Sequence, residues 1–309
     1  MINPTDAMKQ WHIFISLAAL LLLAGCSGQH STLQGELETL VADFPAEVGI
    51  ALISDGDTVC VNGDAGFPLF SVVKFPQALA VAEMMRSNGM LQPCEPSHYD
   101  VKVTAEDLKP DTWSPMRDQH PDGGIFSAEQ LMEYALVESD NNASDILFDH
   151  FASPQQVESF VKGWGIDGCG IAWTEDDQHD APARCYDNWM TPLATVCLLG
   201  RFYEARDRDE RAQFVWQVMT RCQTGANRIP KYLAQQATAI VHKTGTGFIL
   251  PDGTVSGIND IACIVCPDGQ HFELAVFIKN AQCDAATCEE FMAQIAARCC
   301  TFLSERKSR

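Results

Sequence analysis

Strand-like segments at both ends of the chain, separated by a long helical middle, are the feature that most constrains the fold. The strand patterns cover residues 48–54, 58–61, 238–242, 260–265 and 272–278, with an Asp55-Gly56-Asp57 turn between the first two. Helical spacing covers residues 33–44, several segments of 71–219, and residues 285–302. Strands from both ends are expected to meet in one sheet, with the helical middle folding beside it.

This pattern predicts an α+β fold of two domains, with an antiparallel sheet from both chain ends flanked by helices. We expect residues 33–69 and 223–309 to form the α/β sheet domain and residues 70–222 to form an all-α domain. Binding sites favour the place where two such domains meet.

The first 32 residues have the pattern of a targeting segment. Residues 13–22 are apolar but too short for a membrane span, and they lead into Leu23-Ala24-Gly25-Cys26, which resembles a bacterial lipobox. We expect residues 1–25 to be a lipoprotein signal peptide and residues 26–32 a tether lipidated at Cys26. The protein would then be periplasmic and lipid-anchored, or secreted if the lipobox is not used. Residues 1–7 carry no basic residue, so Met8 is an alternative start to Met1.

Charge and cysteine spacing exclude several classes of function. The 309 residues carry a formal net charge of -20, which opposes nucleic acids and anionic membrane surfaces, so we expect membrane contact only through the lipid anchor. The chain has 13 cysteines, but pairs such as Cys263 and Cys266, three apart in a strand pattern, are poorly placed for bridges. Most of them are expected to be small buried side chains. We predict no metal or other cofactor, and a monomer.

A candidate nucleophile lies in Phe70-Ser71-Val72-Val73-Lys74. Lys74 follows Ser71 by three residues, and at helical spacing this puts a hydroxyl and an amine on one face. At a helix N-terminus the serine would also lie among free backbone N–H groups that can stabilise an oxyanion. A helix cap beside a solvated lysine is the alternative for this motif alone.

Two further motifs follow in order. Ser139 and Asn141 lie two apart at a break between helical segments, where an ordinary helix-to-helix turn is the alternative. Later, Lys243, Thr244 and Gly245 end a strand pattern, and Gly245 and Gly247 would allow a close approach to the backbone.

Together the three motifs resemble those of class A serine β-lactamases and penicillin-binding proteins. The details are similar to the extended class A branch typical of Bacteroidota, through Glu138-Ser139-Asp140-Asn141-Asn142, Tyr186-Asp187-Asn188-Trp189 and Thr224-Gly225-Ala226-Asn227-Arg228. The resemblance covers essentially everything after the signal segment. It implies β-lactam substrates and a serine acyl-enzyme.

The resemblance also assigns roles. Ser71 would attack the β-lactam after losing its proton to Lys74 or, through a water, to Glu175, and Ser139 would relay a proton to the leaving nitrogen. The loop from Trp173 to Pro192 looks like the omega loop of the family, with Glu175 as the base that activates the hydrolytic water. The other implied substrate-binding residues are Asn141, Arg228, Lys243, Thr244, Gly245, Thr246 and Trp113, the last as an aromatic wall.

Departures from the family's usual pattern concern this loop and the cleft. His179 stands where the commoner enzymes have a water-holding asparagine, and the loop lacks their usual internal Arg–Asp pair. Phe70 and Gly247 stand where class A carbapenemases carry a cysteine pair, which lowers the expectation of carbapenem hydrolysis. We expect hydrolysis favouring cephalosporins and penicillins. The alternative is a D,D-peptidase or a penicillin-binding sensor with slow turnover.

Overall fold

The computed structural model describes residues 27–87 and 99–307. Residues from Phe44 onward form one compact unit, and the preceding helix α2 (Ser27–Ala42) is described by itself. The proposed signal peptide and Cys26 lie outside the described residues. Among the helices of residues 27–87 and 99–307, none has the length and hydropathy that a membrane span requires.

A five-stranded antiparallel sheet is formed by both ends of this unit, as expected. The order across the sheet is β2 (Asp57–Val61), β1 (Glu47–Ser54), β10 (His271–Ala281), β9 (Val255–Val265) and β8 (Ala239–Thr246). β1 lies beside β10 in the register Ile50 to Val276, so segments more than 200 residues apart are paired directly. β8 is an edge strand, and its outer backbone groups are therefore not used by a further strand.

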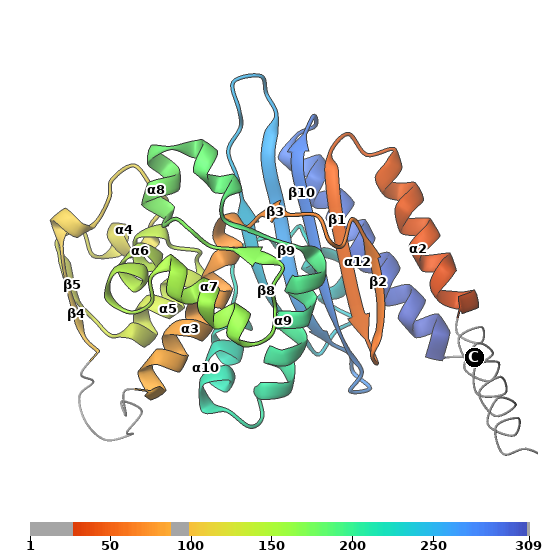
Figure 1. Ribbon diagram of the computed structural model, residues 1–309, viewed down its shortest axis with the longest axis horizontal. Coiled ribbons are helices and arrows are strands. Elements are labelled where there is room, and N and C mark those ends of the chain that lie inside the picture. Colours follow the sequence, from red (N-terminus) through yellow and green to blue (C-terminus); the bar gives the residue numbers. More distant parts are fainter. Residues whose placement is uncertain (1–26, 88–98, 308–309) are drawn as a thin grey trace, which may run out of the picture. The chain divides into compact units, whose positions relative to one another are not determined.

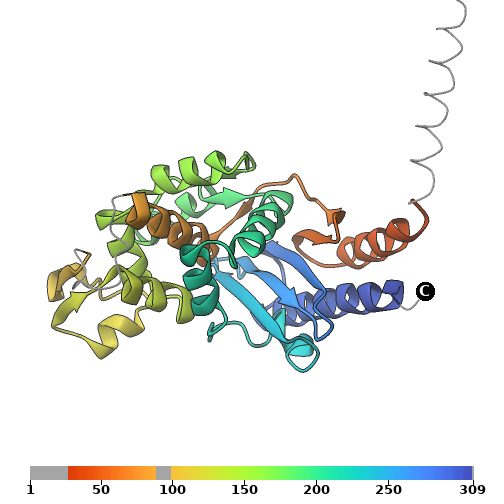
Figure 2. The same ribbon diagram turned by 90° about the horizontal axis from the view of Figure 1, so that it is seen from below.

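Helices cover both faces of the sheet. α9 (Pro192–Ala205) packs on β1, β10 and β9, and α12 (Ala285–Lys307) packs on β10 and β9. Figure 2 shows the sheet edge-on with α9 and α12 on opposite sides. Because helices cover both faces of the sheet, the side chains on both faces of β10 are buried. One face carries Leu274, Val276 and Ile278, and the other carries Ala275 and Phe277. The alternation expected for residues 272–278 therefore marks two apolar faces.

The helical region is arranged around α3 (Lys74–Ser87). α5 (Ala128–Val137), α6 (Asn141–His150), α7 (Pro154–Gly163) and α10 (Glu210–Met219) pack on it, as Figure 1 shows. Local signals set several of these starts: Ser127 with Gln130 and Ser153 with Gln156 form capping boxes. The shorter helices of the unit are α4 (Pro115–Gln119), α8 (Glu175–Asp180), α11 (Pro230–Leu233), and the 3₁₀ helices η1 (Phe70–Val73), η2 (Ala105–Asp107) and η3 (Pro182–Tyr186).

Five short strands were not anticipated from the sequence. They are β3 (Phe67–Pro68), β4 (Val101–Thr104), β5 (Gly123–Phe126), β6 (Cys169–Gly170) and β7 (Trp189–Met190). β4 pairs with β5, while β7 lies between β3 and β6 and closes the loop that carries α8. β3, β6 and β7 have two residues each and therefore no readable periodicity, because alternation needs at least four residues to be visible. β4 has four residues and does alternate, with Val101 and Val103 buried, so this strand was readable but was not identified.

Candidate active site

Ser71 lies in η1, one turn before the first residue of α3, Lys74. Phe70, just before Ser71, has a φ of 46°, in the left-handed region that bulky residues rarely adopt. Such strain persists where surrounding packing enforces it. The turn brings Lys74 Nζ to 2.7 Å from Ser71 Oγ, so the predicted hydroxyl–amine pair is in hydrogen-bond contact.

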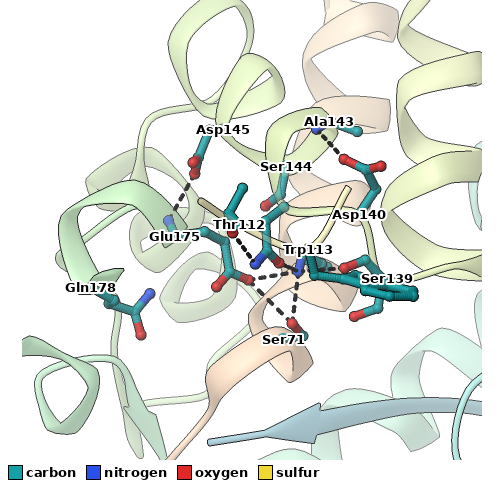
Figure 3. A network of polar contacts seen from close by, with 12 residues as sticks. Ser71, Thr112, Trp113, Ser139, Asp140, Ala143, Ser144, Asp145, Glu175 and Gln178 are labelled. Atoms are coloured by element: carbon teal, nitrogen blue, oxygen red, sulfur yellow. Dashed lines mark hydrogen bonds and ion pairs between the residues drawn. The ribbon is translucent and has the colours of Figure 1, made fainter. Parts of the chain in front are cut away.

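The side-chain Nζ of Lys74 is fully buried and surrounded by oxygen atoms. Besides Ser71 Oγ, it donates to Asn141 Oδ1 at 2.6 Å and to the backbone oxygen of Ser139 at 3.1 Å. Its Nζ also lies 2.7 Å from Glu175 Oε1, which compensates a charge that would be costly to bury alone. Ser71 Oγ is 3.3 Å from the same carboxylate oxygen, and Figure 3 shows Ser71 and Glu175 facing each other. Two basic groups thus reach one hydroxyl.

The break between α5 and α6 presents Ser139. This residue has a φ of 60°, and Asp140 behind it is buried, accepting N–H bonds from Ala143 at 2.9 Å and Met116 at 2.7 Å. Burial raises the pKa of Asp140 above its ordinary range, while these donors and Ser114 act in the opposite direction. The buried cap therefore holds the turn that places Ser139 and Asn141 (Figure 3).

Lys243 comes from the edge strand β8 and reaches the same turn from the other side. Its Nζ donates to Ser139 Oγ at 2.9 Å and to the backbone oxygen of Thr244 at 2.9 Å. Burial, followed by the nearby charge of Lys74, lowers the pKa of Lys243 to about 7. A second buried amine therefore contacts a hydroxyl at this site.

Glu175 begins α8, and a residue that the sequence analysis missed holds this helix start. Asp145 of α6 accepts the backbone N–H of Glu175 at 2.7 Å and that of Asp176 at 3.0 Å. Figure 3 shows the Asp145 carboxylate turned to the Glu175 backbone. These N–H groups belong to the first turn, where no intrahelical acceptor exists. The spacing of Asp145 four residues after Asn141 was the only available signal, and it placed the two on one helix face.

The loop around α8 carries its own cross-links. Asn188 Oδ1 accepts the N–H groups of Ala172 and Trp173 at 2.8 and 2.9 Å, which ties the two ends of the loop together. Arg184 Nη1 lies 3.2 Å from Asp177 Oδ1, so the loop contains an Arg–Asp contact although the family's usual pair is missing.

Two neighbouring side chains about one turn after Glu175, Gln178 and His179, differ in exposure. His179 is exposed, whereas Gln178 is buried, with its Nε2 donating to the backbone oxygen of Thr174 at 2.9 Å. Gln178 is three residues from Glu175 and therefore on its face of α8. The correspondence of His179 to the family's asparagine stays a prediction; the burial of Gln178 is a feature of helix phase, which only the structure supplies.

A cavity of about 320 Å³ opens above these groups. It is lined by Ser71, Trp113, Ser139, Asn141, Thr224, Arg228, Thr244 and Thr246. Trp113 is 64% exposed at its edge and donates its indole N–H to the backbone oxygen of Glu138 at 2.9 Å. Lys74 and Glu175 contact the lining residue Ser71, and Lys243 contacts the lining residue Ser139.

Arg228 and Gly245 serve the packing of β8 as well. Arg228 is buried and donates to the backbone oxygens of Gly245 and Asn259, to Thr246 Oγ1 at 2.7 Å, and to Glu289 at 3.0 Å. A Cβ on Gly245 would lie 2.4 Å from the backbone oxygen of Leu69. The glycine predicted to admit another molecule thus also admits the chain's own segment before η1.

The comparisons with known proteins cover nearly the whole chain. A model of the β-lactamase enzyme family matches residues 32–303. A β-lactamase of Bacteroides uniformis is 33% identical over 87% of this chain and 89% of its own length, and the β-lactamase VEB-1 of Pseudomonas aeruginosa is 29% identical over 92% and 94%.

Solved structures agree with the sequence matches. The extended-spectrum β-lactamase TLA-3 superposes with a TM-score of 0.83 at 30% identity, covering 88% of this chain and 98% of that one. A class A β-lactamase from Bacteroides cellulosilyticus has a TM-score of 0.80 at 28% identity, with 90% and 99% covered. With the serine, the two buried lysines and the glutamate assembled as described, this chain belongs to the class A β-lactamases.

Proposed function

We propose that this enzyme hydrolyses β-lactams through an acyl-enzyme on Ser71 and clears it with a water activated by Glu175. The observation that carries the proposal is the contact of Ser71 Oγ with both Lys74 Nζ, at 2.7 Å, and Glu175 Oε1, at 3.3 Å. A nucleophile within hydrogen-bond reach of a base is the arrangement that acyl transfer requires. Lys74 or Glu175 takes the hydroxyl proton as the Ser71 Oγ–carbonyl bond forms.

The oxyanion would bind to the backbone N–H groups of Ser71 and Thr246. The position of Thr246 on an edge strand supports this role, because outward N–H groups there lack a strand partner. As the ring C–N bond breaks, Ser139 Oγ delivers a proton to nitrogen. Its contact with Lys243 Nζ, at 2.9 Å, supports replacement of that proton from the amine.

Substrate binding would use the cavity wall on β8 and the turn at Asn141. The substrate carboxylate would accept hydrogen bonds from Thr244, Thr246 and the ammonium of Lys243. Arg228 would orient Thr246 by donating a hydrogen bond to its Oγ1. Asn141 Nδ2 donates to Thr112 Oγ1 at 2.7 Å, so an acylamide oxygen of the substrate would compete with Thr112 for that donor. Gly245 keeps the strand close to η1, and Trp113 forms the outer aromatic wall.

Glu175 then acts as base for deacylation. Its backbone is held by Asp145, and its carboxylate lies between the nucleophile and Lys74. We infer that Gln178, on the same face of α8, helps to hold the water. Relatives described as extended-spectrum β-lactamases support cephalosporins among the substrates, alongside penicillins.

The test is hydrolysis of a chromogenic cephalosporin, followed by stopped flow and by intact-mass analysis of the same mixture. Sustained turnover with little standing adduct supports the proposal. Glu175→Gln should still acylate but accumulate the adduct, because general-base catalysis contributes typically about 10²–10⁴-fold. A single stoichiometric burst by the unaltered protein would instead indicate a penicillin-binding sensor, and D-alanine release from a wall peptide would indicate a D,D-peptidase.

We also propose that the protein is a monomer anchored in the periplasm through a lipid on Cys26. The apolar stretch and lipobox-like residues of the N-terminus support this. Mass spectrometry of the N-terminal peptide from the membrane fraction tests the anchor, since an unmodified Cys26 in secreted protein would contradict it. Sedimentation analysis tests the monomer.

A further inference from the structure

A second cluster of ionisable side chains lies beside β8 and outside the catalytic groups. It joins Cys222, in the loop after α10, to His242 on β8 and Asp260 on β9. His242 Nδ1 is 3.0 Å from Asp260 Oδ1, and both side chains are buried. The other carboxylate oxygen of Asp260 accepts the N–H of Ile229 at 3.2 Å, which fixes its orientation.

A carboxylate, an imidazole and a thiol in this order favour the thiolate form, which is the nucleophilic form of a cysteine. Asp260 lies on the Nδ1 side of the imidazole, and the side chain of His242 also interacts with the Cys222 thiol. A cysteine beside a protonated histidine that is held by a carboxylate is a typical activated nucleophile. Lys243, the next residue along β8, adds a further charge near the thiol.

Ionisation of Cys222 follows from these neighbours. Burial by itself raises the pKa of the Cys222 thiol, but the hydrogen bond and charge of His242, together with Lys243, lower it to about 7. Burial disfavours the charged form of His242, yet Asp260 and Cys222 raise the His242 pKa to about 10. Cys222 and His242 therefore form a thiolate–imidazolium pair near neutral pH.

Other cysteines have the opposite environment. Burial raises the pKa of the thiols of Cys169 and Cys185 to about 11, and it raises that of Cys197 as well. A difference of four pKa units changes the thiolate fraction about 10⁴-fold. The thiolate of the more acidic thiol is intrinsically less nucleophilic by about 10²-fold, which offsets part of this advantage. Cys222 should hence react about 100-fold faster than such thiols at equal access.

Cys222 is also accessible and connected to the substrate cavity. It is partly exposed, and its neighbours in the chain, Arg221 and Gln223, are exposed. Its Sγ lies 3.4 Å from Thr224 Oγ1, and Thr224 Oγ1 lies 2.6 Å from Thr244 Oγ1. Both threonines line the cavity, so a group attached to Cys222 would displace part of its wall.

We propose that Cys222, activated by His242 and Asp260, is a covalent modification site for small disulfides, and that its modification weakens β-lactam binding at Thr244. The second part rests on the proposed function. The Cys222 thiolate attacks one sulfur of a disulfide RS–SR, the S–S bond breaks, and an Sγ–S bond forms. The departing RS⁻ takes a proton from water, so Cys222 is oxidised as one RS group is reduced. A free thiol reverses the step.

The test treats the folded protein with 2,2′-dithiodipyridine at pH 7 and follows thiopyridone release, with peptide mapping of the labelled cysteines. We expect a fast phase of one equivalent that maps to Cys222, at least about tenfold faster than other sites. Cys222→Ser should remove this phase, and the matched control Cys197→Ser, also partly exposed, should retain it. His242→Gln should slow it about tenfold while Cys222 remains present.

Hydrolysis kinetics test the second part separately. The protein labelled in the fast phase should show a severalfold higher KM for a cephalosporin, reversed by dithiothreitol, and the KM of Cys222→Ser should not respond to the probe. A fast phase on another cysteine, or none, overturns the modification site whatever the activity. Full labelling of Cys222 with an unchanged KM overturns the coupling to Thr244. Failure of the unlabelled protein to hydrolyse β-lactams would contradict the proposed function and leave the labelling result standing.

Discussion

Asp145→Asn is the substitution that best tests how the loop positions its base. The two carboxylate oxygens of Asp145 accept the N–H groups of Glu175 and Asp176, at 2.7 and 3.0 Å. Burial and the charge of Glu175 raise the pKa of Asp145 well above its ordinary range, and these two donors and Lys74 oppose that rise. Through its two hydrogen bonds, the Asp145 side chain holds the first turn of α8.

An asparagine has the same shape but only one oxygen. It can accept one of the two N–H groups, and its own NH₂ would face the other donor. Losing a hydrogen bond to a charged group costs about 1.5–3 kcal/mol. If that cost falls on the position of Glu175, deacylation slows about 10- to 150-fold.

Acylation should change less, because Ser71 keeps its contact with Lys74 at 2.7 Å. The expected result is an accumulating acyl-enzyme, measured by single-turnover stopped flow with a chromogenic cephalosporin and by quenched intact-mass analysis. Asp149→Asn is the matched control, since Asp149 is exposed one turn later on α6 and loses the same charge. Deacylation by Asp145→Asn at the unaltered rate, with no standing adduct, would refute the positioning role of Asp145.

Three further predictions concern binding, pH and stability. Arg228→Lys should raise KM about tenfold with a smaller change in kcat, because lysine cannot reproduce the planar fork that bonds several oxygens, and an unchanged KM would contradict this. Burial, followed by the charge of Lys74, lowers the pKa of Lys243 to about 7, so its ammonium form is present below that pH. We therefore expect kcat/KM to fall as pH rises through about 7, and Lys243→Arg to move this fall to higher pH. A flat pH profile would contradict the role of the Lys243 ammonium in substrate binding. Phe277→Ala, on the buried strand β10, should lower the free energy of unfolding by about 3–5 kcal/mol in urea titration, while Ile249→Ala, 75% exposed, should change it by less than about 0.5 kcal/mol.

Local signals made much of the fold predictable. The capping boxes at Ser127 and Ser153 and the turn at Asp55-Gly56-Asp57 depend on atoms a few residues apart, so the sequence contains all the groups involved. The antiparallel sheet from both chain ends was predicted from the order of strand and helix patterns along the chain. Its strand order was not, because β1 beside β10 is one of several pairings that the apolar patterns allow.

The candidate site divides in the same way. Ser71 and Lys74 are one helical turn apart, so their contact follows from helix geometry alone. The contact of Lys243 with Ser139 joins residues 104 positions apart, and only the family resemblance suggested it. The burial of Gln178 was not predicted, because the phase of α8 depends on what it packs against.

The sequence by itself determined which residues carry chemistry and which short segments are helices, strands and turns. Only the tertiary structure decided that Asp145 holds the start of the Glu175 helix and that Cys222, His242 and Asp260 come together beside β8. The physical reason is range. A cap or a turn is formed by neighbours in the chain, whereas hydrogen bonds and pKa shifts at these sites arise between segments that approach only when the sheet and the helices pack.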